Sequence, residues 1–247
     1  MPLLYLRKLT GKDRTRSANH QLAHFLALIA GAVDVGGYIA VKQYTSHMSG
    51  LVASMADSLS LGDLKWVLAG FLALLSFLLG AAWCAILVNW GRRRNFKSMY
   101  ALPLVFEAGL LAYFGFAGSH LHMFSWAPVP TTVILLCFAM GLQNAIITKI
   151  SDAEIRTTHV TGTLTDMGIE LGKALYWNRR RDAEPVPVRA DREKLWLLTS
   201  LVGLFFFGGV LGAIGFRQIG FETALPLAAI LLLLAVVPVV DDLRELR

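Results

Sequence analysis

The sequence predicts an all-α polytopic membrane protein with six transmembrane helices, arranged as a 3+3 inverted repeat. Of its 247 residues, 55% are hydrophobic and 16% are charged, and the mean hydropathy is +0.57. A bilayer core about 30 Å thick needs roughly 20 apolar residues in one helix, and no stretch shows the alternation of a membrane β-barrel. Two further observations, an uneven distribution of basic residues and a motif that occurs twice, predict the orientation and the repeat.

Six apolar stretches are long enough to span the bilayer. They lie at 22–41, 65–89, 99–117, 130–149, 195–216 and 223–240. Residues 1–20 form a basic N-terminal segment, and the apolar stretch after it has full spanning length without a small-residue cleavage site. We therefore expect a retained first helix and not a signal peptide.

The basic residues lie on one side of the predicted membrane. Of the 23 Lys and Arg residues, all except Lys42, Lys65 and Arg217 fall in the N-terminal segment, in alternate loops or in the C-terminal tail. Cytoplasmic loops are enriched in Lys and Arg, so the N- and C-termini are predicted to be cytoplasmic. This enrichment also explains the net charge of +6 without a nucleic-acid partner.

One short motif occurs in both halves of the chain. Ser46 to Gly50 reads Ser-His-Met-Ser-Gly, and Thr158 to Gly162 reads Thr-His-Val-Thr-Gly. Each copy follows an apolar helix that carries a polar residue three positions after a glycine, Asp34 in the first half and Asn144 in the second. The predicted spans continue the match, because Phe77 to Ile86 aligns with 205–214.

The third helix of each half opens with Ala-Leu-Pro-Leu, at 101–104 and at 224–227. Three crossings are an odd number, so the second copy must enter the membrane from the opposite side. We therefore predict two inverted three-helix repeats. Their bounds are 21–118 and 129–240, with a cytoplasmic linker at 176–194 inside the second repeat and a cytoplasmic tail at 241–247.

Each motif is followed by an amphipathic stretch too short to cross the bilayer, 51–61 and 163–175. We expect a re-entrant or an interfacial helix in each place. Ser49 and Thr161 are suitable N-cap residues, so each short helix is predicted to begin at its motif. The free N–H groups and positive dipole end of a helix start favour an anion.

Polar sequence at matching positions of two inverted halves predicts a substrate site near the middle of the membrane. The histidines can donate or accept hydrogen bonds near neutral pH, and the hydroxyl and amide side chains add further polar groups. The alternative for both histidines is a capping hydrogen bond at the helix start. The predicted substrate-binding residues are Asp34, Ser46, His47, Ser49, Gln143, Asn144, Arg156, Thr158, His159 and Thr161.

Two carboxylates lie inside predicted spans, Asp34 and Glu107. Because a charged group is costly in the bilayer core, we predict that Asp34, together with Glu107, couples transport to protons. The alternative is an interhelical hydrogen bond that fixes the packing. Asp166 and Glu170 are four residues apart, hence on one helical face, and are expected to line a cytoplasmic vestibule. Like charges at this spacing repel unless they are solvated or neutralised by Lys173 or Arg156.

Neither a metal site nor a cofactor is predicted. A metal site needs three or four ligands, and only the two motif histidines are candidates. Cys84 and Cys137 fall within spans and read as small buried residues. The chain has no nucleotide-binding loop, no nucleophile elbow and no zinc-protease helix, so no enzymatic activity is expected.

The leading functional hypothesis is a secondary transporter of a small polar or anionic solute, with a site formed by the two histidine motifs. Its partners would be the lipid bilayer and that solute. The alternative is a non-transporting membrane protein that binds a partner protein or anionic lipid through its basic cytoplasmic loop, which contains Arg179, Arg180 and Arg181.

The sequence resembles the YoaK-like family of bacterial membrane proteins, catalogued as a domain of unknown function, over about residues 20–240. The resemblance rests on Gly31 to Asp34, Ser46 to Gly50, Gly141 to Ala145 and Arg156 to Thr163. Family members typically have Thr-Gly-Asn after the first motif histidine, where this chain has Ser49, Gly50 and Leu51. The resemblance implies a bacterial inner-membrane protein with about six spans, and it implies no substrate.

Overall fold

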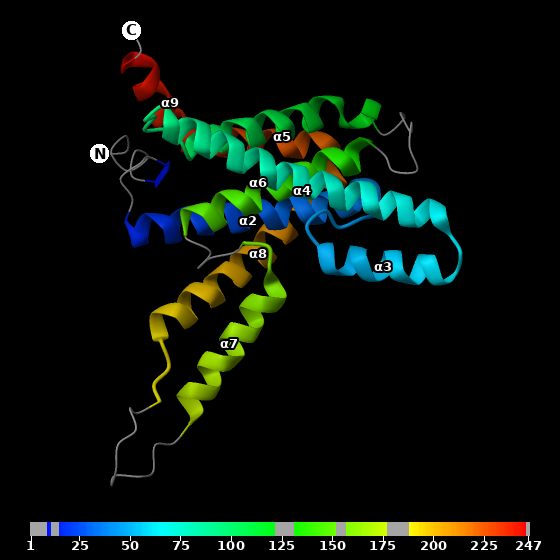
Figure 1. Ribbon diagram of the computed structural model, residues 1–247, viewed down its shortest axis with the longest axis horizontal. Coiled ribbons are helices and arrows are strands. Elements are labelled where there is room, and N and C mark those ends of the chain that lie inside the picture. Colours follow the sequence, from blue (N-terminus) through cyan, green and yellow to red (C-terminus); the bar gives the residue numbers. More distant parts are fainter. Residues whose placement is uncertain (1–8, 11–14, 122–130, 152–156, 177–187, 246–247) are drawn as a thin grey trace.

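The computed structural model describes residues 9–10, 15–121, 131–151, 157–176 and 188–245. Within these ranges the chain is helical and contains no β-strand (Figure 1). The helices are α2 (Arg16–Val41), α3 (Met48–Ser60), α4 (Leu64–Arg93), α5 (Ala101–Leu121), α6 (Thr131–Ile150), α7 (Val160–Leu175), α8 (Arg192–Gln218), the 3₁₀ turn η1 (Gly220–Thr223) and α9 (Ala224–Glu245).

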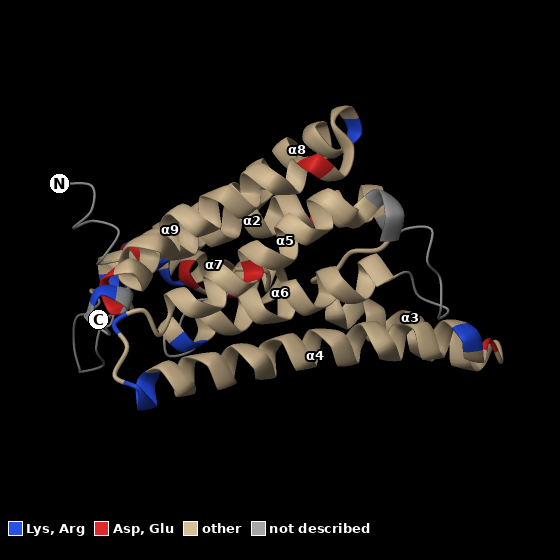
Figure 2. Cartoon of the chain, turned by 90° about the horizontal axis from the view of Figure 1, so that it is seen from above, with Lys and Arg blue, Asp and Glu red and all other residues tan. Residues whose placement is uncertain are grey.

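Six of these helices are long and apolar enough to cross a membrane, α2, α4, α5, α6, α8 and α9, so the predicted number of spans is confirmed. In Figure 2 most of the charged residues lie near the helix ends. The helices extend past several predicted spans, because their first turns are polar and capped. For example, α8 begins at Arg192, where the Asp191 side chain accepts a hydrogen bond from the backbone N–H of Lys194 at 3.0 Å.

The described parts of the basic N-terminal segment, residues 9–10 and 15–20, belong to the helical bundle. Helix α2 begins at Arg16, inside the predicted 1–20 segment, with Thr15 as its N-cap. Leu9 and Thr10 are fully buried. The Thr10 hydroxyl donates a hydrogen bond of 2.8 Å to the Leu234 carbonyl of α9. An apolar residue and a satisfied hydroxyl thus place this part of the N-terminus against the last helix.

The long helices pair across the two halves of the chain. Helix α2 packs chiefly along α8, α4 along α6, and α5 along α9. Glycines permit the first two pairings, since a Cβ on Gly31 would collide with the Phe205 carbonyl oxygen and one on Gly141 with that of Phe77. Small residues let membrane helices approach closely enough for backbone contact. Side chains join the helices further, and Ser76 of α4 donates to the Ile134 carbonyl of α6 at 2.6 Å.

The two short segments after the motifs form the helices α3 and α7, of 13 and 16 residues. Helix α3 lies along the start of α4, and α7 lies beside the start of α8 (Figure 1). The predicted N-caps were wrong. Both helices begin one residue before Ser49 and Thr161, and the N-cap residues are His47 and His159.

Candidate functional site

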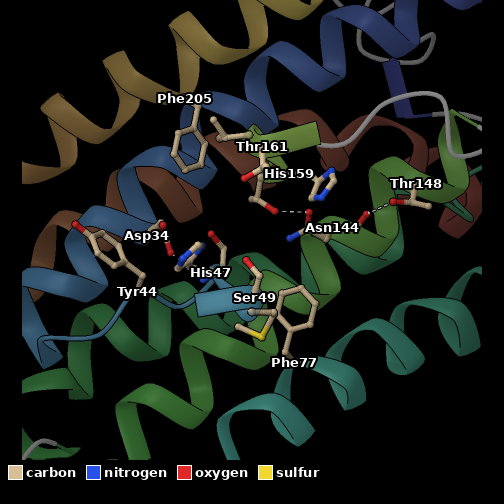
Figure 3. Close-up of a pocket in the computed structure, with 14 residues that line it drawn as sticks. Asp34, Tyr44, His47, Ser49, Phe77, Asn144, Thr148, His159, Thr161 and Phe205 are labelled. Carbon is tan, nitrogen blue, oxygen red and sulfur yellow. Dashed lines mark hydrogen bonds between the residues drawn. The ribbon is translucent and has the colours of Figure 1, made fainter. Parts of the chain in front are cut away.

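A cavity of about 760 Å³ lies where the two short helices begin (Figure 3). It is bounded by α2, α3 and α4 from the first half and by α6, α7 and α8 from the second. The lining residues are Asp34, Tyr44, Ser46, His47, Met48, Ser49, Phe77, Asn144, Thr148, Thr158, His159, Val160, Thr161 and Phe205.

The cavity brings together eight of the ten predicted substrate-binding residues. Most of the lining consists of residues that align between the two halves of the sequence. Asp34 aligns with Asn144, Phe77 aligns with Phe205, and residues 46–49 align with 158–161. Matched side chains from distant parts of the sequence therefore surround one space.

Asp34 holds the turn between α2 and α3. The side chain is 6% exposed, and its Oδ1 accepts hydrogen bonds from the backbone N–H groups of Thr45 at 2.9 Å and Ser46 at 2.8 Å. The Thr45 hydroxyl donates to the same oxygen at 3.3 Å. A carboxylate can accept several such bonds at once, so the end of α2 positions the backbone of the first motif.

Asn144 positions the second motif, as Asp34 positions the first. Its Oδ1 accepts a hydrogen bond of 2.6 Å from the Thr158 hydroxyl, and its Nδ2 donates to the Met140 carbonyl at 2.9 Å. Thr148 donates to the Asn144 carbonyl at 2.7 Å. The amide therefore positions the second motif through a side-chain hydroxyl, where Asp34 uses two backbone N–H groups.

The two histidines occupy the same local geometry. The backbone angles are φ −88° and ψ 66° at His47, and φ −83° and ψ 60° at His159. Neither makes a side-chain capping hydrogen bond, so the capping alternative is wrong. Each ring instead lies against the glycine three residues later, because a Cβ on Gly50 or Gly162 would collide with it. Packing of the ring on the first helical turn explains the His-x-x-Gly spacing.

The starts of α3 and α7 are electropositive. The first N–H groups of a helix have no intrahelical acceptor, and neither helix has a side-chain cap or an acidic residue in its first turn. Ser49 and Thr161, in these first turns, both line the cavity. Two positive helix ends and two imidazoles therefore border the same space.

Several cavity residues were not predicted as site residues. Phe77 and Phe205 served only as markers of the repeat, yet Figure 3 shows them on opposite sides of the polar group. Their alignment between the halves was the signal that could have identified them. Tyr44 and Thr148 also line the cavity. Thr148 lies one helical turn after Asn144, a spacing that places both on one helical face.

Three predicted residues do not line this cavity or are not described. Gln143 is fully buried and donates from Nε2 to the Leu26 carbonyl of α2 at 3.1 Å, which is a packing contact. Glu107 on α5 is 1% exposed, and its Oε2 has no hydrogen-bond partner in the described part of the chain. Arg156 lies outside the described residues, as does the Arg179 to Arg181 part of the basic loop.

Across the described ranges, no group of three or more His, Cys, Asp or Glu side chains is placed to hold a metal ion. Asp34 is the only acidic residue among the fourteen that line the cavity, and none of the fourteen is Lys or Arg. The polar groups that a bound molecule would meet are therefore imidazoles, hydroxyls, one amide, one carboxylate and helix N–H groups. The apolar groups are the phenyl rings of Phe77 and Phe205 and the side chains of Met48 and Val160.

Comparison with known proteins identifies the family. A family model described as "Protein of unknown function (DUF1275)" matches residues 22–237. The chain is 27% identical over 161 residues to the UPF0700 transmembrane protein YoaK of Bacillus subtilis (strain 168), an alignment that covers 65% of this chain and 70% of that protein. No solved structure matches the chain. The chain therefore belongs to the DUF1275 family of YoaK-like membrane proteins.

Proposed function

We propose that this protein is a secondary transporter of a small polar or anionic solute, and that the cavity between the two histidine motifs is its binding site. The observation that carries the proposal is the lining of one cavity by aligned residues of both halves. Transporters built from inverted repeats place the substrate between the repeats, at broken or short helices. In this proposal the solute is moved without chemical conversion, and no cofactor takes part.

Three features support an inverted repeat. Gly31 meets the Phe205 carbonyl and the aligned Gly141 meets the Phe77 carbonyl, so the same contact occurs twice with the halves exchanged. The short helices have the same N-cap histidine with the same backbone angles. The following long helices, α4 and α8, both begin after an N-cap aspartate, Asp63 and Asp191.

The preference for an anion follows from the groups that face the cavity. The N-terminal ends of α3 and α7 meet there, and each is worth roughly 0.3–1 kcal/mol toward a nearby negative charge, more where it is shielded from water. Protonated His47 and His159 would add positive charge. Asp34 opposes this preference less than a free carboxylate would, because two backbone N–H groups bind its Oδ1.

In the proposed transporter, Asp34 binds and releases the coupling proton. Protonation would remove its negative charge from the cavity and weaken its hold on the N–H groups of Thr45 and Ser46. A proton would thus change both the electrostatics of the site and the position of the first motif. Glu107 stays a prediction, since it is buried on α5 and is not among the lining residues.

The proposed setting is the bacterial inner membrane, with both termini in the cytoplasm. Helix α7 would then lie on the cytoplasmic side of the membrane, and the turn between α3 and α4 would lie on the opposite side. The distribution of Lys and Arg supports this orientation.

The test is ligand binding and flux with purified protein. Thermal stability in detergent is measured against a panel of inorganic anions, carboxylates, amino acids and sugars. A ligand at a hundred times its Kd stabilises the native state by about 2.7 kcal/mol. Compounds that raise the melting temperature are then tested for uptake into proteoliposomes with and without a pH gradient.

The binding-site variant is Thr161→Val, which keeps the size of the side chain and removes the hydroxyl from the cavity. We expect it to fold normally and to lose most of the stabilisation by the ligand. A well-folded protein that no compound stabilises, and that carries no flux, would refute transport and favour the basic loop as a docking segment for a partner or lipid.

A further inference from the structure

A second cavity, of about 320 Å³, lies between α3 and α4. Tyr44 and His47 line both this cavity and the central one, so the two spaces adjoin at these side chains. The second cavity is lined by Lys42, Gln43, Tyr44, His47, Gly50, Leu51, Ser54, Met55, Ser58, Trp66, Ala69 and Gly70. It lies on the α3 side of the central cavity, and we call it the vestibule.

The corresponding positions of the second half carry charges. Asp166 aligns with Ser54, Glu170 with Ser58, and Lys194 with Trp66. There the Lys194 ammonium lies 3.9 Å from Asp166 Oδ2 and 4.0 Å from Glu170 Oε1. Where the first half has a vestibule, ion pairs join α7 to α8.

Glu170 is the centre of this ion cluster. It is 2% exposed, its Oε1 accepts a hydrogen bond of 2.8 Å from Lys173, and its Oε2 accepts one of 2.8 Å from the backbone N–H of Asp191. The predicted neutralisation by Lys173 is therefore present. Both carboxylate oxygens of Glu170 are bound to neighbouring groups, and the predicted cytoplasmic vestibule stays a prediction.

The two halves secure the start of the long helix by different means. The N–H of Asp63 donates to the Ser58 carbonyl at 2.9 Å, within a tight backbone turn. The aligned N–H of Asp191 donates to the Glu170 carboxylate. A side-chain contact can break without unwinding either helix, whereas the backbone turn cannot. Among the described residues, the α7 side therefore has a side-chain connection that can open and close without a change in either helix.

We propose that the α3–α4 cavity is the route by which the solute reaches the central cavity in this conformation, and that the cluster of Asp166, Glu170 and Lys194 closes the matching route between α7 and α8. This inference rests on the proposed function. Opening of the cluster exchanges access from one side of the membrane to the other. Lys42, at the vestibule with its ammonium 5.9 Å from the centre of the Tyr38 ring, places positive charge where an anion would arrive.

The test compares two aligned positions, Met55 and Met167. Each is replaced by cysteine in full-length protein that carries Cys137→Ala and retains the buried Cys84 as an internal reference. Reaction with a membrane-impermeant maleimide is measured in vesicles of both orientations. We expect Met55→Cys to react from one side only, and Met167→Cys to react at least about tenfold more slowly from either side.

Adding Lys194→Met should raise the reactivity of Met167→Cys about tenfold, from the side opposite to the one that labels Met55→Cys. The matched control is Lys65→Met, which removes a lysine next to Trp66 and should leave both rates unchanged. Equal rates for the two cysteines with an intact cluster would overturn the proposal. So would no response to Lys194→Met, or a simultaneous reaction of Cys84, which would mean that the whole bundle had loosened.

Labelling does not require transport, so the two proposals can fail separately. Flux without this labelling pattern would refute the gate alone. If the protein shows the labelling pattern but neither binds nor carries any solute, transport would be refuted, and the difference in access between the two sides would still hold.

Discussion

At the scale of single residues, each histidine motif depends on the polar side chain one helix earlier. Asp34 binds two backbone N–H groups of the first motif, and Asn144 binds the Thr158 hydroxyl of the second. At this aligned position, the first half has an ionisable carboxylate and the second half has an amide that cannot ionise. This difference separates the structural role of the position from its proposed role in proton coupling.

We expect Asp34→Asn to fold and to lose proton dependence. The amide oxygen can still accept the hydrogen bonds, as the natural Asn144 shows, whereas it cannot bind a proton. Asp34→Ala leaves the N–H groups of Thr45 and Ser46 without their acceptor, at a cost of about 1–3 kcal/mol. Thermal melts and proteoliposome flux at several pH values measure both effects. Proton-dependent flux in Asp34→Asn would contradict the assignment.

The ring of His159 needs the space above Gly162. A methyl group there would collide with the ring, so Gly162→Ala should displace the imidazole and weaken ligand binding at least about tenfold, which is ~1.4 kcal/mol. Gly168 lies on the same helix with no atom within 4 Å of a built Cβ, so Gly168→Ala is the control. Calorimetric titration of the stabilising ligand checks this, and equal affinity in the two variants would contradict it.

At the scale of helices, α3 and α7 begin alike and are attached differently. Both have an N-cap histidine, and the long helix after each begins at an N-cap aspartate. Three residues join α3 to α4, whereas the connection from α7 to α8 runs from Tyr176 to Asp191. In the second half the Glu170 carboxylate adds a side-chain contact between α7 and the start of α8.

This attachment should depend on pH. Two hydrogen bonds lower the pKa of Glu170 below its ordinary value of 4.5. The larger effect comes from the Lys173 side chain and the smaller one from the Asp191 N–H. In the unfolded chain Glu170 keeps its ordinary pKa and binds a proton more readily than in the folded protein. Its contribution to the stability of the folded state is therefore complete above the ordinary pKa, and it is lost as the pH falls through the lowered, folded-state pKa. Proteolysis of the α7–α8 connection should therefore accelerate in acid.

The control for the pH experiment is Glu170→Gln, which cannot titrate. Its connection should be cleaved faster than that of the wild type at neutral pH, and its cleavage should change little as the pH falls. A parallel acid response in both proteins would show that another group controls the attachment.

At the scale of the whole molecule, glycines hold the two halves together. Gly31 and Gly208 meet backbone carbonyls across the α2–α8 contact, and Gly80 and Gly141 do so across the α4–α6 contact. The bilayer supplies little hydrophobic driving force between helices, so close van der Waals packing of this kind carries much of the association. The cavity lies between these two contacts.

Gly31→Ala should destabilise the fold by about 1–3 kcal/mol, the usual cost of inserting a methylene into a packed interior. Its Cβ would meet the Phe205 backbone, which cannot rotate away as a side chain can. Gly203→Ala on α8 adds the same group where no atom lies within 4 Å, and it should be neutral or slightly stabilising. Thermal unfolding in detergent distinguishes the two, and equal melting temperatures would contradict the close approach.

The sequence alone determined the membrane class, the six spans, the two short helices and most of the residues around the cavity. These features follow from apolar length and from a motif that occurs twice, both of which are local properties of the chain.

Only the tertiary structure decided which residues meet. It placed Phe77 and Phe205 on the cavity, Gln143 in the interior, and Leu9 and Thr10 against α9. It also joined Glu170 to Lys194 and Asp191. Such contacts depend on the rotation and crossing of helices far apart in the sequence, and these are set by the packing of all the helices together, whereas a periodic pattern describes one helix at a time.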